Sequence, residues 1–272
     1  MSYHDVLAIL LSAQEEQVLR AAELTAGKTV GRVTALHVFE MPMLAVSDGA
    51  GATVVWPQIL EQTRTDALAE QKKIRLQLKA LEPNSELRTL ETPRALAGEG
   101  VGQQAMHADI AVMQAPRSDL SIAAFEGALF NSGRPVILTP PSWRGDSLGE
   151  NILIAWKPTR EAARAVADAA PFINAAKNVT VLCIDAMPGP YGQRPGHDIA
   201  THLARDGAHV DVRNVSGQGR FPETAIIDEA RALGADLIVI GGYGHGRLRE
   251  FVLGGVTRSL SRDCPIPILM SH

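Results

Sequence analysis

The glycines of the C-terminal region have a spacing that can create an anion-binding site. An apolar run at residues 237–240 ends in Gly241, and further glycines follow at Gly244 and Gly254. A strand that breaks into glycines and re-enters a helix leaves several backbone N–H groups without intrachain partners. Those donors, together with the positive end of a helix dipole, form a seat for a phosphate group. The spacing Gly-x2-Gly-x9-Gly therefore predicts that this part of the chain binds an anion.

These residues resemble the motif of the universal stress protein family, whose nucleotide-binding members use it to hold the ribose and phosphates of ATP. The resemblance implies that Gly241 and Gly244 contact the ribose and phosphates. It places the backbone amides that follow Gly254, and a hydroxyl, at the phosphate chain. The implied set is Ala155 and Lys157 at the edge of the nucleotide, Cys183 and Ile240 beside the base, and Gly241, Gly244, Gly254, Gly255, Val256 and Thr257 at the sugar and phosphates.

Two positions depart from the family pattern. The family usually carries Ser or Thr directly after the third glycine, where this chain has Gly255, so a side-chain donor is lost while the backbone N–H remains. Its ATP binders also carry an acidic residue just after the first strand of the domain, where this chain has Lys157. An ammonium group can pair with a phosphate, but it cannot accept hydrogen bonds from the nucleotide. We therefore expect ATP or AMP with Mg²⁺ as the ligand, unless the site has been retuned to another anion that Lys157 holds.

The same residues also have plainer interpretations. Glycine can simply mark a tight turn from a strand into a helix, but four glycines at the family spacing, with Thr257 behind them, favour an anion seat. His245 and Arg247 lie between the glycines, where they are either solvated loop residues or ligands of a terminal phosphate. Both interpretations of these two side chains stay open.

The chain runs twice through the same order of strand-like and helical segments. The strand-like runs are residues 5–10, 33–39, 87–90, 108–116 and 134–140 in the first half, and 151–156, 179–184, 210–215, 235–243 and 266–272 in the second. Helical patterns follow the first run of each half, with Ser12 and Glu15 in capping-box spacing and Thr159 as an N-cap. Strands that alternate with helices indicate parallel sheets with helices on both faces. We predict an α/β fold of two tandem universal-stress-protein-like domains, each with a five-stranded, mainly parallel sheet.

The boundary between the halves is predicted at residues 141–150, a polar segment rich in Gly, Ser and Pro. Residues 151–272 form the domain with the glycine motif, and residues 1–141 form a degenerate domain without it. Where the second half reads GGYGHG the first reads QAPRSD (114–119), and where the second reads LGGVT the first reads LFNSG (129–133). Because the last strand of this family usually pairs across a dimer interface, we expect a homodimer or a pseudo-dimer within one chain.

Composition narrows the range of partners. Hydrophobic residues make up 46% and charged residues 21%, as in globular proteins, and a net charge of −4 gives no sign of a nucleic-acid partner. Cys183 and Cys264 have no CxxC partner or nearby His pair, so no metal site is expected. The N-terminal apolar run follows Asp5 rather than a basic region, and no run is long enough to span a bilayer. We expect a cytoplasmic protein without membrane contacts.

No pattern in the sequence indicates a catalytic centre. Residues 145–149 match G-x-S-x-G, but that nucleophile motif must follow a strand and open a helix, whereas here it runs into a strand. We therefore assign no catalytic residue, and we expect a stress-response regulatory protein that binds ATP or AMP through its second half without robust turnover. A ligand-free scaffold for unknown protein partners and a slow ATPase stay open as alternatives.

Overall fold

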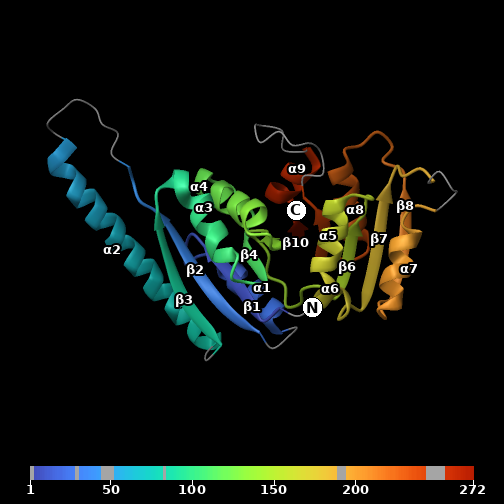
Figure 1. Cartoon of the computed structure of the whole chain (residues 1–272), viewed down its shortest axis with the longest axis horizontal. Coiled ribbons are helices and arrows are strands. Elements are labelled where there is room, and N and C mark those ends of the chain that lie inside the picture. The colour runs from blue at the N-terminus through green and yellow to red at the C-terminus, as the bar shows by residue number, and fades with distance from the viewer. Residues whose placement is uncertain (1–2, 28–30, 44–51, 82–83, 189–193, 243–254) are drawn as a thin grey trace.

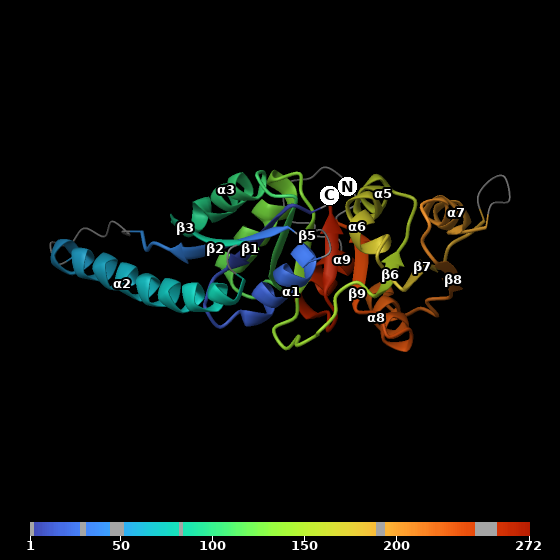
Figure 2. The same cartoon turned by 90° about the horizontal axis from the view of Figure 1, so that it is seen from below.

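The computed structural model of the chain describes residues 3–27, 31–43, 52–81, 84–188, 194–242 and 255–272. Within these ranges, ten strands form one continuous sheet with helices on both sides (Figures 1 and 2). The strand order is β3-β2-β1-β4-β5-β10-β9-β6-β7-β8. The bounds are β1 Asp5–Leu10, β2 Arg32–Glu40, β3 Ser85–Thr92, β4 Ile110–Gln114, β5 Val136–Thr139, β6 Asn151–Ala155, β7 Asn178–Ile184, β8 Val210–Val215, β9 Leu237–Gly241 and β10 Ile268–Ser271.

Two five-stranded halves meet at one antiparallel pair of strands. All neighbours within β1–β5 pair in parallel, as do all neighbours within β6–β10. β5 and β10 instead run antiparallel, with Ile137 opposite Leu269 and Val136 opposite Met270. These four side chains are fully buried. The predicted α/β class and mainly parallel pairing are confirmed, and the last strands of the two halves pair within one chain.

Two hydrophobic cores lie on opposite faces of the sheet, and each core takes residues from both halves. One face is covered by α1 (Glu16–Gly27), α2 (Ala52–Leu78), α5 (Arg160–Asp168), α6 (Ala170–Ile173) and α7 (His197–Arg205). The other face is covered by α3 (Arg94–Ala105), α4 (Asp119–Glu126), α8 (Pro222–Ala232) and α9 (Gly255–Asp263). Two short turns, η1 (Lys79–Leu81) and η2 (Gly127–Asn131), follow α2 and α4. The apolar strand runs reflect this burial on both faces.

Contacts beyond the sheet also join the two halves. The hydroxyl of Tyr3, at the start of the first half, donates to the Asp168 carbonyl at 2.5 Å. The Tyr3 ring lies 5.6 Å from the ring of Phe172 in α6. On the second half, Arg164 donates to the Gly133 carbonyl of the first at 3.1 Å. The halves are therefore fixed relative to each other through side chains as well as strands.

An aspartate in front of the fourth strand ties each half together in the same way. Asp109 accepts hydrogen bonds from the backbone N–H groups of His4 and Asp5, at 2.7 and 3.0 Å. In the second half, Asp236 accepts from the N–H of Asn151 at 2.9 Å. Each aspartate thus joins the beginning of a fourth strand to the beginning of a first strand. The internal repeat that the sequence indicates is present at the level of single contacts.

The serine of the G-x-S-x-G match has a structural partner. Its hydroxyl, on Ser147, donates to Asp236 Oδ2 at 2.9 Å. The match lies between β5 and β6 and leads into a strand, without the strand-to-helix turn that an exposed nucleophile needs. Ser147 therefore helps to hold the aspartate that fixes the start of β6.

The first helices of the two halves begin differently. Thr159 caps α5 as predicted, since its side chain accepts from a backbone N–H three residues further on. The capping box predicted for Ser12 and Glu15 is wrong. α1 begins after these residues, at Glu16, and the Glu15 carboxylate turns back to accept from the Leu11 N–H at 3.0 Å.

Helix α2 extends beyond the rest of the first half in both views (Figures 1 and 2). Its C-terminal part adds Ile74 and Leu78 to the core, whereas Leu68 and Leu76 are 62% and 59% exposed. Among the residues that the structure describes, no helix combines the length and the apolar character needed to cross a bilayer. Helix α2 therefore contributes to the core near its C-terminal end and also exposes leucine side chains on its surface.

The Glu15 carboxyl should make stability depend on pH. Burial raises its pKa from 4.5 to about 7, partly opposed by the hydrogen bond from Leu11. The folded chain then binds a proton that the unfolded chain releases, so this carboxyl lowers the free energy of unfolding as pH rises from about 4.5 to 7. Glu15→Gln removes the ionisation and keeps the acceptor, so we expect it to exceed the wild type in stability at pH 8, by up to roughly 3 kcal/mol.

Urea unfolding at pH 4 and pH 8 measures this difference. Glu16→Gln, which removes the exposed carboxyl next to Glu15, controls for the loss of one negative charge. A Glu15→Gln protein that gains nothing between pH 4 and pH 8 would contradict the buried-carboxyl explanation.

Candidate functional site

The ligand edge of the second half lies where the direction of its strand connections reverses. From β6 the chain moves outward to β7 and β8, and it then returns to the other side of β6 as β9. In open α/β sheets ligands bind in the crevice that such a reversal creates at the carboxyl ends of the strands. Ala155 ends β6, Gly241 ends β9, and Ala155 pairs with Ile240 between the two strands. Three of the predicted site residues therefore meet at the reversal.

Gly241, the last residue of β9, and Gly242, which follows it, pack against α5 and against the first half of the chain. A Cβ on Gly241 would lie 2.5 Å from the Glu161 carbonyl carbon, because the start of α5 packs directly on it. Gly242 is buried and donates its N–H to the Ser271 carbonyl at 2.7 Å. A Cβ on Gly242 would lie 3.4 Å from Leu129 Cδ2, which belongs to the first half. Helix packing alone therefore requires glycine at position 241, whatever the ligand.

Four apolar residues at this edge share one face of the sheet. Ala155, Ile184, Ile240 and Val256, here called the apolar edge, pack with the core that α8 and α9 cover. Ala155, Ile184 and Val256 stay partly exposed. Cys183 precedes Ile184 on β7, so its side chain points to the opposite face, where it is buried in the other core.

The structure thus does not bring Cys183 and Ile240 to one face. Ile184, the next residue along β7, lies on the same face of the sheet as Ile240. The alternation of side chains along a strand could have identified Ile184, but only once the pairing of β6 with β7 and with β9 was known.

The start of α9 offers backbone donors to a ligand. Gly255 is the first residue of α9 and is exposed, and a Cβ placed on it would meet no atom of the described residues within 4 Å. The first N–H groups of a helix have no acceptor within the helix, and the positive end of its dipole lies there. Thr257 is buried, with 7% of its surface exposed. The accessible donors at this point are therefore backbone amides rather than side chains.

Two charged side chains follow the neighbouring strands. Lys157 is exposed in the short turn between β6 and α5, where its carbonyl accepts from the Thr159 N–H at 2.7 Å. Asp185 follows β7 with a φ of 49°, and its carboxylate accepts from the Gly217 N–H at 2.9 Å and the Ser216 hydroxyl at 3.3 Å. The Asp185 carboxylate therefore joins the loops after β7 and β8.

Part of the predicted seat lies outside the described residues. Gly244 and Gly254 belong to that part, as do the histidine and arginine between them, and the contacts expected of them stay predictions. Within the described ranges, no three His, Cys, Asp or Glu side chains form a group that could hold a metal ion. Burial raises the pKa of Cys183, and it raises that of Cys264 to about 11, so both thiols stay protonated at neutral pH.

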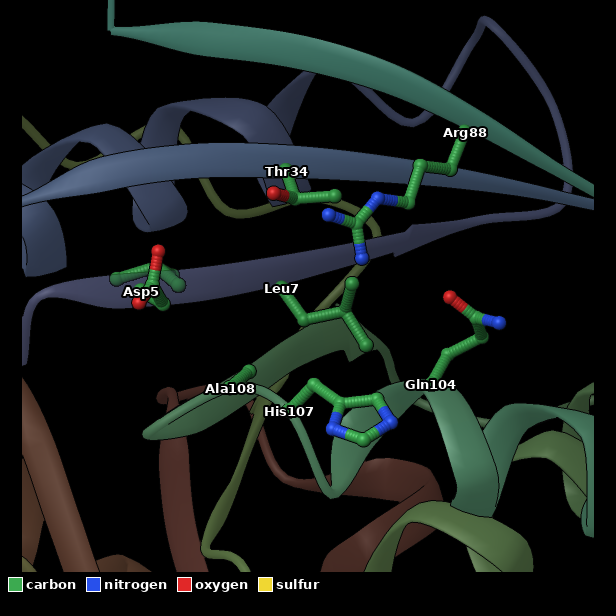
Figure 3. Close-up of a pocket in the computed structure, with 8 residues that line it drawn as sticks. Asp5, Leu7, Thr34, Arg88, Gln104, His107 and Ala108 are labelled. Atoms are coloured by element: carbon green, nitrogen blue, oxygen red, sulfur yellow. The ribbon is translucent and has the colours of Figure 1, made fainter.

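A cavity of about 170 Å³ lies in the first half, away from the ligand edge of the second (Figure 3). Figure 3 shows the Arg88 guanidinium reaching over it from β3, with Gln104 and His107 at the end of α3 below. Arg88 pairs with Glu86 at 2.5 Å, and the carboxylate of Asp5 lines the same cavity. This cavity contains both signs of charge and none of the predicted site residues.

The corresponding turn of the first half uses its backbone donors internally. Ser118 caps α4 by accepting from the Ser121 N–H at 3.2 Å, and the Ser121 hydroxyl accepts from the N–H groups of Arg117 and Ser118 at 2.9 and 2.8 Å. The predicted match of residues 129–133 with LGGVT is wrong, because they follow α4 and precede β5, whereas Gly255 opens α9. The helix start of the first half is therefore already occupied by serine hydroxyls.

Two glycine substitutions should show that Gly241 is required for packing and that Gly255 is not. Gly241→Ala forces the start of α5 to move, so we expect a loss of about 1–3 kcal/mol in the free energy of unfolding. Gly255→Ala adds a methyl group in open space at a helix start, so its stability should stay within about 0.5 kcal/mol of the wild type. Urea midpoints measured with unchanged m-values test both. Equal stability of the two variants would refute the packing role of Gly241.

Comparisons with known proteins agree with this architecture. The model of the universal stress protein family matches residues 150–272. A universal stress protein from Archaeoglobus fulgidus DSM 4304 is 17% identical over 98% of both chains, with a TM-score of 0.73. A putative universal stress protein from Pseudomonas aeruginosa UCBPP-PA14 is 15% identical, with a TM-score of 0.60, over 99% of this chain and 93% of that one. No curated protein matches the chain.

Structural likeness at these identities shows the fold alone, and it extends over both halves of the chain. The family match is confined to the half that carries the glycines and the open start of α9. Residues 150–272 therefore form a domain of the universal stress protein family, and the first half of the chain repeats the same fold.

Proposed function

We propose that the second half binds an adenine nucleotide, ATP or AMP with Mg²⁺, as part of a stress-response regulatory function and without robust turnover. The observation that carries the proposal is the exposed start of α9, where Gly255 leaves open space above backbone donors. It lies in the half of the chain that belongs to the family and has the glycine motif. The first half closes the corresponding helix start with Ser118 and Ser121.

The described residues suggest separate contacts for the phosphates, the base and the Mg²⁺ ion of the nucleotide. The phosphates would accept hydrogen bonds from the N–H groups at the start of α9, with Lys157 supplying a positive charge. The base would lie against the apolar edge, with Ala155 and Ile184 as its exposed members. Mg²⁺ would be held chiefly by phosphate oxygens and water, as is usual for this ion with nucleotides. Cys183 keeps no contact with the base in this arrangement.

Binding without turnover fits the ionisable groups that the structure describes at this edge. Hydrolysis needs a base within hydrogen-bond reach of the attacking water. The Asp185 carboxylate is engaged with Gly217 and Ser216, and the ammonium of Lys157 cannot accept a proton. We therefore infer a nucleotide-dependent regulator rather than an efficient ATPase.

A scaffold function is the second candidate, and one observation favours it. Helix α2 projects from the first half and exposes Leu68 and Leu76 on its surface. An exposed amphipathic helix is a common element of protein contacts. In the scaffold alternative the second half would need no ligand, so measurements of nucleotide binding separate the two.

Calorimetric titration of the full chain with ATP and magnesium should show one site. The second half has the open helix start, whereas the first half has none among its described residues, so the stoichiometry should not exceed one nucleotide per chain. Two equivalent sites would contradict the assignment to the second half. Absence of any binding would favour the scaffold.

Substitutions at Gly255 and Lys157, the two positions that depart from the family pattern, test which ligand binds. Gly255→Ser adds a hydroxyl donor where there is space for it, and a hydrogen bond to a charged group can strengthen binding by roughly 10- to 100-fold at best. Lys157→Asp restores the acidic residue of the family, and together with Gly255→Ser it should tighten ATP binding further. If another anion is the ligand, Lys157→Asp should abolish its binding. Titrations of both variants with ATP and with inorganic phosphate distinguish the two results.

A further inference from the structure

We propose that Phe130 of the first half and His272, after β10, are positioning residues for the nucleotide site of the second half. They act on Gly241 and Gly242, here called the glycine corner, where the chain leaves β9. The proposal rests on the proposed function because the corner forms part of that site. It gives the half without the glycine motif a role in building the site of the other half.

The contacts form a short chain from one half to the other. The Nδ1 atom of His272 lies 3.2 Å from the Gly242 carbonyl oxygen. Because a carbonyl only accepts, Nδ1 carries the proton and donates it. The Phe130 ring, in η2, lies 4.9 Å from the imidazole at an angle of 82°, which is the favoured edge-to-face arrangement. Phe130 therefore orients the imidazole that holds Gly242.

The glycine corner is enclosed from both sides of the sheet. On one side the start of α5 packs against Gly241 at Glu161. On the other side Leu129, which precedes Phe130 in η2, lies next to Gly242. The strand pairing adds the hydrogen bond from the Gly242 N–H to Ser271. The direction in which the chain leaves β9 is thus determined partly by the first half.

The exposure of the Phe130 and His272 side chains helps to distinguish a positioning role from a contribution to global stability. His272 is exposed, so His272→Ala removes little buried surface and is the variant in which the two roles separate, whereas Phe130 is only 37% exposed and Phe130→Ala also removes buried ring surface. A purely structural role would change the urea midpoint and leave local properties of the corner alone. A positioning role would alter the corner while global stability stays near that of the wild type.

Amide hydrogen exchange on the full chain without nucleotide gives the first readout. In Phe130→Ala and His272→Ala we expect the Gly242 amide to exchange at least about threefold faster, while amides of β1 keep their rates. His272→Asn retains a donor near Nδ1, so it should restore much of the protection. His202→Ala, which removes an exposed imidazole on α7, is the matched control.

Titration of the same variants with ATP and magnesium gives the second readout. Affinity should fall about 3- to 10-fold in Phe130→Ala and in His272→Ala, as expected for one lost hydrogen bond. The double variant should lose no more than His272→Ala alone, because Phe130 acts through His272. His272→Asn should bind more tightly than His272→Ala.

The outcomes separate this inference from the proposed function. Unchanged exchange at Gly242 in both alanine variants overturns the positioning role, whatever the nucleotide does. Faster exchange with wild-type affinity in the variants also overturns it, because the corner would then not matter for binding. Faster exchange in a chain whose wild type binds no nucleotide supports the positioning contacts and refutes the proposed function instead.

Discussion

The antiparallel pairing of β5 with β10 is the contact on which the rest of the structure depends. Each half ends in a strand whose outer N–H and C=O groups would otherwise form an exposed edge. Three residue pairs, among them Ile137 with Leu269, satisfy these groups within one chain. The pairing also makes the sheet continuous, so that two cores run across both halves instead of four smaller ones. The larger cores bury more apolar surface than two separate domains would.

This pairing also has a consequence for the site. Because β5 runs antiparallel to β10, the segment that precedes β5 lies beside the carboxyl ends of β9 and β10. Leu129 and Phe130 belong to that segment, and they reach Gly242 and His272. The first half closed its own helix start with serine hydroxyls, yet it supports the corner of the other half. One half therefore contributes contacts to the candidate site of the other half.

Much of the fold could be predicted from the sequence because buried parallel strands are near-continuous apolar runs between helical segments. The runs at 5–10, 151–156 and 179–184 coincide closely with β1, β6 and β7. Helix starts were less predictable, because Ser12 and Glu15 fit a capping box by spacing alone, whereas Glu15 in fact bonds to Leu11. Only tertiary structure decides which of two such local arrangements forms.

The site was predictable in part. Glycines and helix starts have a local signature, so Gly241 and Gly255 could be identified from spacing, although packing against α5 gives Gly241 a second reason that no spacing reveals. The face on which a strand residue lies depends on register, which is why Ile184 and not Cys183 joins Ile240. The match of residues 129–133 with LGGVT failed because the connections between the fourth and fifth strands differ in length. Contacts between the halves, such as Phe130 with His272, have no signature in the sequence.

We propose that an adenine nucleotide binds to the second half of the chain and not to the first. Mass spectrometry of the small molecules released when the purified full chain is denatured tests it most directly, because no ligand has to be chosen in advance. We expect an adenine nucleotide at no more than one equivalent per chain, and its loss from a Gly254→Val variant that remains folded. Recovery of two equivalents, of a different ligand, or of no nucleotide even after incubation with ATP and magnesium would contradict it.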